Sequence, residues 1–181
     1  MPISSYERNL YCSIGRVACE SANTEQILRA TLRGYSVVDE AYTVIYEGQS
    51  YEWLAECIRT IFKAAFDVLL ENHPEYRMAK TNYDAVNGAL IDIRPLRDKR
   101  NFIIHGTWSI CPGEDECRAT PSHSENHENP GFHFSRSRSR RYWQEQVHLT
   151  ALDIAQLAES IETKNETLSA ILARAKPVMT F

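Results

Sequence analysis

Apolar residues recur at helical spacing along four long stretches of the chain, which predicts four helices. The first stretch covers about residues 6–35 and has small polar residues in the middle of its apolar face. Asn23 could cap a second helix within it, with Gln26 at the third position, but we predict one long helix. This face consists of Leu10, Ile14, Val17, Ser21, Thr24, Leu28, Thr31 and Tyr35.

Three further helices are predicted beyond an irregular segment at residues 36–50. The second helix covers about residues 51–72 and should be central, because its apolar stripe is broadened by Trp53, Phe62, Phe66 and Val68. The third covers about residues 82–105, and Pro95 inside it should kink it or split it in two. The fourth begins at Thr150, where an acidic residue three positions later completes the pattern of a capping box.

A different pattern separates the third and fourth helices, at residues 107–148. Segments 107–111, 132–137 and 142–150 have strand character, whereas residues 112–131 are rich in Pro, Gly, Ser, Asn and Glu and predict a mobile loop. We therefore predict a mainly α protein: a four-helix bundle with a small β-hairpin or sheet insertion between helices three and four.

Composition adds limits to this picture. A chain of 181 residues suits one domain, residues 1–181, and its net charge of −4 argues against non-specific binding of polyanions, so any nucleic-acid contact needs a local basic patch. We find no signal peptide and no long apolar run, which predicts a cytoplasmic protein without a membrane span. The five cysteines are then expected to be reduced thiols, with Cys12, Cys19 and Cys57 as small core residues.

Arg100 is the most informative single residue, because it shares the apolar face of the third predicted helix. A guanidinium there keeps its charge and needs an anionic or hydrogen-bonding partner. That partner could be a carboxylate such as Glu20 or Glu25, which would make Arg100 a structural residue. The apolar residues one turn away from it are Leu96, Ile103 and Ile104.

His105 follows five residues after Arg100, at the end of the same helix. On an ideal helix it lies about 7.5 Å along the axis and about 140° around it, so the two side chains diverge at the backbone but their tips can border one cleft. A helix C-terminus favours the protonated imidazole, and histidine exchanges protons near neutral pH. The alternative is that His105 merely caps the last carbonyl groups.

The string from Leu96 to Gly106 resembles the signature of the HEPN superfamily, which reads R-N-x-x-x-H here, from Arg100 and Asn101 to His105. The resemblance implies a helical-bundle homodimer in which the Arg and His of both chains line a cleft. Many such proteins are metal-independent ribonucleases that act as toxins or in antiviral defence. Arg100 would hold the scissile phosphate, His105 would move a proton, and Asn101 would orient the pair or contact the phosphate.

The resemblance leaves a second function open, because other HEPN proteins have lost catalysis. The chain would then be a binding or regulatory module for RNA, a nucleotide or a protein. A cognate antitoxin or regulatory protein is a further possible partner under either function. The insertion at residues 107–148 departs from the minimal family pattern.

Two groups of basic residues could contact RNA. Arg97 and Lys99 lie just before the signature. The alternative is that they belong to a solvated helix face. Further along, arginines alternate with serines on a predicted strand and aromatic residues follow, an arrangement suited to phosphate contacts and base stacking. A strand edge protected by charge is the alternative. The residues of this second group are Arg136, Arg138, Arg140 and Trp143.

Metal binding is the last chemistry that the sequence raises. Two cysteines and three histidines between residues 111 and 133 are spaced more loosely than the ligands of ordinary structural zinc sites. We find no phosphate-binding glycine loop, nucleophile elbow or zinc-protease helix. We therefore expect neither a metal nor a cofactor. The residues considered for zinc are Cys111, Cys117, His123, His127 and His133.

Overall fold

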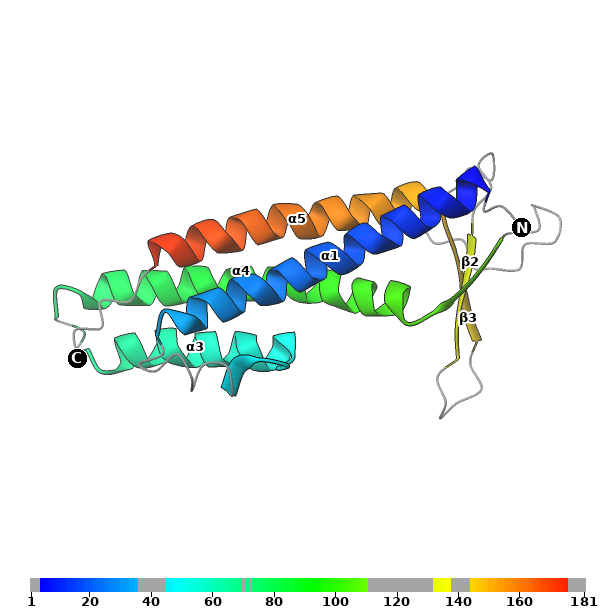
Figure 1. Cartoon of the computed structure of the whole chain (residues 1–181). Helices are drawn as coiled ribbons and strands as arrows, with labels where there is room; N and C mark the ends of the chain where they lie inside the picture. Colours follow the sequence, from blue (N-terminus) through cyan, green and yellow to red (C-terminus); the bar gives the residue numbers. More distant parts are fainter. Residues whose placement is uncertain are drawn as a thin grey trace. The chain divides into compact units, whose positions relative to one another are not determined.

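The computed structural model describes residues 4–35, 45–69, 71, 73–110, 132–137 and 144–175. Within these ranges the protein is mainly helical, which confirms the helical class that the apolar spacing predicted. Its helices, labelled in Figure 1, are α1 (Ser5–Arg33), α3 (Tyr51–Asp67), α4 (Tyr76–Ile104) and α5 (Ala151–Arg174).

The helix bounds agree with the sequence in part. Helix α1 is continuous, so the alternative break at Asn23 does not occur. Helix α3 ends at Asp67, earlier than predicted, and α4 begins at Tyr76, also earlier than predicted. Helix α4 is not split at Pro95, which lies within it.

Capping boxes begin two of the helices. At α5, the backbone N–H of Thr150 donates to Asp153 Oδ2 at 2.7 Å, and the backbone N–H of Asp153 donates to Thr150 Oγ1 at 3.1 Å, which confirms the predicted motif. Ser4 and Glu7 make the same reciprocal pair at α1, where the sequence did not lead us to expect it.

The chain folds as two compact units, and α1, α4 and α5 contribute to both. The sheet unit comprises Met1–Glu20 and Leu96–Ile161, and the helical unit comprises Ser21–Pro95 and Glu162–Phe181. Among the described residues, no helix is both long enough and apolar enough to cross a lipid bilayer.

The sheet unit combines parts of α1, α4 and α5 with an antiparallel sheet in the order β1-β2-β3. Its strands are β1 (Thr107–Ile110), β2 (Phe132–Ser137) and β3 (Gln144–Leu149). Apolar residues of the three helices make its core, and Trp108 and Leu149 of the sheet pack against them. The buried residues of this core are Leu10, Val17, Ile103, Ile154, Leu157, Ala158 and Ile161.

Two cysteines of α1 lie outside this core. Cys12 and Cys19 are exposed, and Cys57 of the helical unit is partly buried. The prediction that they are small core residues is therefore wrong for Cys12 and Cys19. Their neighbours Leu10 and Val17 take the buried positions instead, which leaves the cysteines on the other side of the helix.

The helical unit packs α3 and the remaining parts of α1, α4 and α5 around one core. Two of its buried residues are joined by a polar contact: Thr24 Oγ1 of α1 donates to Asn165 Oδ1 of α5 at 2.6 Å. Tyr51 of α3 is also buried, and its hydroxyl donates to the Leu90 carbonyl of α4 at 3.0 Å. The largest fully buried side chains of this core are Leu28, Leu32, Leu54, Ile58, Phe62, Leu90, Ile93 and Leu168.

Candidate functional site

The residues of the R-N-x-x-x-H signature lie at the C-terminal end of α4, within the sheet unit. Ile104 is the last residue of the helix, and Gly106 follows in the bend before β1. The backbone N–H of His105 still donates to the Asn101 carbonyl at 3.3 Å, so His105 stays attached to the last turn. Its side chain is exposed.

Asn101 connects the other two residues of the signature. Its side-chain Oδ1 accepts a hydrogen bond from Nη1 of Arg100 at 2.8 Å, while its backbone carbonyl accepts the N–H of His105. Arg100 and Asn101 are both partly buried, so this bond from a charged donor is shielded from bulk water in part. The hydrogen bond to Asn101 restricts the rotamers of Arg100.

Arg97 occupies a different environment from the one predicted. Only 8% of its surface is exposed, so the interpretation of Arg97 as part of a solvated helix face is wrong. It lies four residues after the buried Ile93 and continues the inward face of α4. Because Arg97 is buried, its guanidinium is not available for the RNA contact that the sequence predicted.

The structural alternative for Arg100 named two carboxylates, and one of them has a partner on its own helix. Glu25 Oε2 accepts from Nη2 of Arg29 at 3.3 Å, and Arg29 also donates to the Gln49 carbonyl at 3.1 Å. This contact holds the segment before α3 against α1. Glu25 is therefore engaged within the helical unit.

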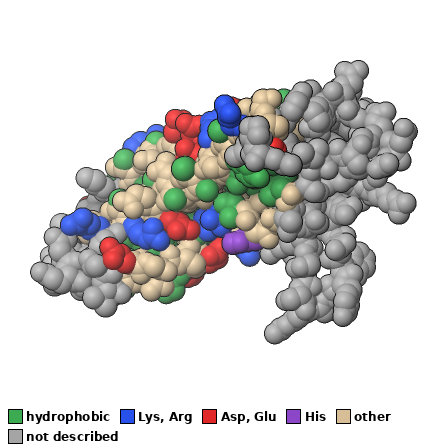
Figure 2. All heavy atoms as spheres, turned by 45° about the vertical axis from the view of Figure 1, so that its right-hand side comes forward, with side chains coloured by type: hydrophobic (Ala, Val, Ile, Leu, Met, Phe, Trp, Pro, Cys, Tyr) green, Lys and Arg blue, Asp and Glu red, His purple; other side chains and the backbone are tan. Residues whose placement is uncertain are grey.

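Surface charge near the signature is mixed in sign. Lys99 is exposed, as predicted, and so is the neighbouring Asp98. On the face drawn in Figure 2, Lys and Arg side chains are interspersed with Asp and Glu. An RNA contact on the face drawn in Figure 2 would therefore depend on a few cations, not on a broad basic surface.

Trp108 of β1 is a further residue at this end of α4, and the sequence analysis did not select it. Its indole Nε1–H donates to the Ile103 carbonyl at 3.2 Å, and its ring packs against the core of the sheet unit. A tryptophan shortly after the end of a helix is a weak signal, because nothing in the sequence shows that the ring turns back.

The second group of basic residues and the residues considered for zinc lie in or around the strands of the sheet. Arg136 lies in β2, at the register position opposite Glu145 of β3. Arg138, Arg140 and Trp143 lie outside the described residues, as do four of the five residues considered for zinc. Within the described part of the chain, no group of three or more His, Cys, Asp or Glu side chains is placed to hold a metal ion.

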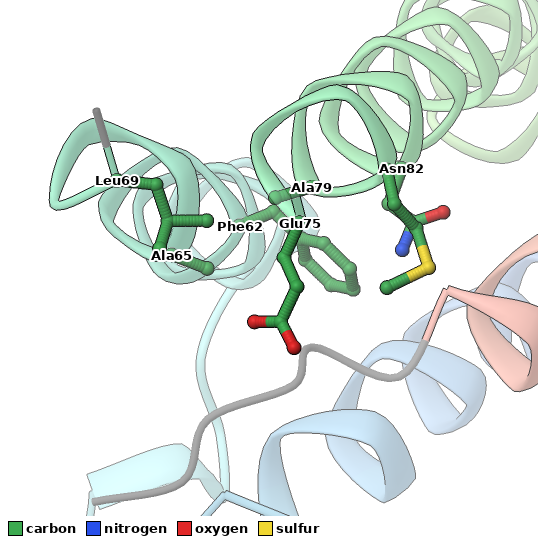
Figure 3. Close-up of a pocket in the computed structure, with 7 residues that line it drawn as sticks. Phe62, Ala65, Leu69, Glu75, Ala79 and Asn82 are labelled. Carbon is green, nitrogen blue, oxygen red and sulfur yellow. The ribbon is translucent and has the colours of Figure 1, made fainter. Parts of the chain in front are cut away.

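A small pocket lies in the helical unit between α3 and the start of α4 (Figure 3). Its volume is about 20 Å³, which suits roughly one water molecule. It contains none of the predicted site residues and is too small for a nucleotide. The residues that line it are Phe62, Ala65, Leu69, Glu75, Met78, Ala79 and Asn82.

Comparison with known proteins gives no further guide to the site. The chain matches no protein-family model, no curated protein and no solved structure. Any functional conclusion therefore depends on the residues and their geometry.

Proposed function

We propose that this protein is a metal-independent ribonuclease of the HEPN type, acting as a toxin or an antiviral-defence effector. The observation that supports it best is that Asn101 bonds to both residues at the end of α4: its side chain accepts from Arg100 Nη1, and its carbonyl accepts the backbone N–H of His105. This hypothesis includes the HEPN-like four-helix bundle with its β insertion, a homodimeric assembly and a cytoplasmic location.

Arg100 would bind the scissile phosphate. A guanidinium has five N–H donors and keeps its charge at any physiological pH, so it can hold Asn101 and a phosphate oxygen together. Its planar fork suits two oxygens of one phosphate, and it would stabilise the negative charge that develops there during cleavage. Lys99, which is exposed one residue away, would attract the backbone of the RNA.

His105 would transfer protons. In the proposed reaction the 2′-oxygen of a ribose attacks the adjacent phosphorus, and its proton passes to a base. The bond from phosphorus to the 5′-oxygen breaks, and that oxygen receives a proton. The products are a 2′,3′-cyclic phosphate and a 5′-hydroxyl, so the step consumes neither water nor metal. An exposed imidazole can serve as either the base or the acid.

The main alternative is a catalytically inactive HEPN-like module that binds RNA, a nucleotide or a protein. The burial of Arg97 and the acidic net charge favour it, because both reduce the cations available for RNA. A cognate antitoxin or regulatory protein is a proposed partner in either case.

The decisive experiment compares cleavage of a mixed single-stranded RNA pool in buffer containing EDTA. Wild type should cleave and leave cyclic phosphate ends, whereas His105→Ala should not cleave. Its matched control is His73→Ala, because His73 is also exposed but lies in the helical unit. Cleavage by His105→Ala at the wild-type rate, or a need for added metal, would contradict the proposal.

Two further variants test the role of the arginine. Arg100→Lys should fail, because an ammonium cannot reproduce the planar fork, while Arg94→Lys on an exposed part of α4 should be active. Asn101→Asp should fold and still fail, because a carboxylate would pair with Arg100 and repel phosphate. If wild type binds the RNA pool but no protein cleaves it, the binding module becomes the better explanation.

A further inference from the structure

A side chain from the sheet closes the turn that carries His105. The indole N–H of Trp108 in β1 donates to the carbonyl of Ile103, the second-last residue of α4, at 3.2 Å. Trp108 is partly buried, and its ring packs against the core of the sheet unit. His105 and Gly106 therefore lie between two residues that are joined by a hydrogen bond.

This contact is more specific than ordinary capping. The last carbonyl groups of a helix lack intrahelical donors, and water or a C-terminal glycine usually satisfies them. Here the donor belongs to the next element of the chain, so one bond both caps α4 and fixes where β1 leaves it. Water could satisfy the Ile103 carbonyl equally well, but it would not restrain the intervening turn.

We propose that Trp108 is a positioning residue for His105. Its hydrogen bond to Ile103 holds the backbone of the turn, while the Asn101 carbonyl holds the N–H of His105 from the helix side. The backbone from which the imidazole projects is thereby held in place at the end of α4. This role rests on the proposed ribonuclease function, because it concerns the histidine that would transfer the proton.

The first test measures the turn itself and does not require activity. Trp108→Phe keeps an aromatic ring in the core and removes the N–H donor. Hydrogen exchange followed by NMR should then show the amides of His105 and Gly106 exchanging at least about tenfold faster than in wild type. Trp53→Phe is the matched control, since Trp53 is an exposed tryptophan of α3. Unchanged exchange in Trp108→Phe would overturn the proposal.

The second test measures the reaction. Misplacement of a catalytic group by about 1 Å can cost roughly a hundredfold in rate, so Trp108→Phe should lower kcat by at least about tenfold while KM stays within about twofold. A merely structural tryptophan would instead lower the thermal midpoint and leave kcat per folded molecule unchanged, which would also overturn the proposal. If wild type cleaves no RNA, the ribonuclease function and the catalytic role of Trp108 both fail. Faster exchange in Trp108→Phe would then still show that Trp108 holds the turn, so the failure would lie in the ribonuclease function alone.

Discussion

The hydrogen bond between Thr24 and Asn165 gives a quantitative test of the core of the helical unit. Thr24 is 0% exposed and Asn165 is 2% exposed, and the bond from Thr24 Oγ1 to Asn165 Oδ1 is 2.6 Å long. Thr24→Val keeps the shape of the side chain but removes a donor from a buried amide oxygen. Leaving a buried polar atom with one partner fewer should cost about 1–3 kcal/mol in the free energy of unfolding.

The double variant should cost less than its parts. Asn165→Leu alone should cost a similar amount, because it leaves the Thr24 hydroxyl without the amide oxygen. Replacing both partners with apolar groups of similar shape can be nearly neutral, so Thr24→Val with Asn165→Leu should recover at least about 1 kcal/mol of the summed loss. This non-additivity distinguishes a coupled pair from two independent core positions.

Urea denaturation of the full chain measures these free energies. The matched control is Thr167→Val, because Thr167 is exposed on α5. Its hydroxyl donates to the Thr163 carbonyl of the same helix at 2.9 Å. This variant should change stability by no more than about 0.5 kcal/mol. Single-variant effects that add within about 0.5 kcal/mol would refute the coupling between the two helices.

Three further predictions follow from the ends of the helices and from the assembly. Thr150→Ala removes the capping hydroxyl that Asp153 uses and should cost about 1 kcal/mol by denaturation, whereas an unchanged midpoint would argue against the capping box. Hydrogen bonds from Ser4 lower the pKa of Glu7, so its contribution should be lost as the pH falls below about 4; a pH titration of stability should therefore be flatter in Glu7→Gln. Light scattering should give twice the chain mass of 20.8 kDa, and a monomer at tens of micromolar would count against a site that two chains build together.

The helices were predictable because their buried residues repeat at helical spacing, but the end of α3 and the start of α4 were not. Val68 extended the apparent apolar stripe of the second helix, yet it is 79% exposed and lies just beyond the end of α3. The first turns of α4 are the converse case. Met78 is 49% exposed, and none of residues 76–85 is fully buried, so the apolar period that predicted the third helix was recognised only further along.

Arg97 shows why charge alone is a poor guide to exposure. Both interpretations of Arg97 from the sequence, an RNA contact and a solvated helix face, required an accessible guanidinium, although only 8% of the residue is exposed. The positions Leu90, Ile93 and Arg97 nevertheless continue one inward face of α4 at steps of three and four residues. An arginine can lay its aliphatic stem along such a face, so the geometry of the helix was the better predictor.

The signature itself was accessible to sequence reasoning because its contacts are local. The backbone N–H of His105 bonds to the carbonyl four residues before it, which is the regular helix pattern, and the long side chain of Arg100 reaches the next residue along the chain. Trp108 was not accessible in this way, since its bond to Ile103 depends on the path that β1 takes after α4. Local spacing predicted which groups are present, but tertiary structure determines how the turn between them is held.

The exposure of His105 bears directly on the proposed chemistry. Electrostatic stabilisation of a phosphate is strongest where water is excluded, and the exposed His105 and the partly buried Arg100 leave this end of α4 open to water. A second copy placed against this end of α4 would bury both groups and supply a second histidine. The light-scattering measurement of mass therefore also tests whether a second chain is present to exclude water from the site. A protein that cleaves RNA as a strict monomer would need the substrate itself to displace water from Arg100.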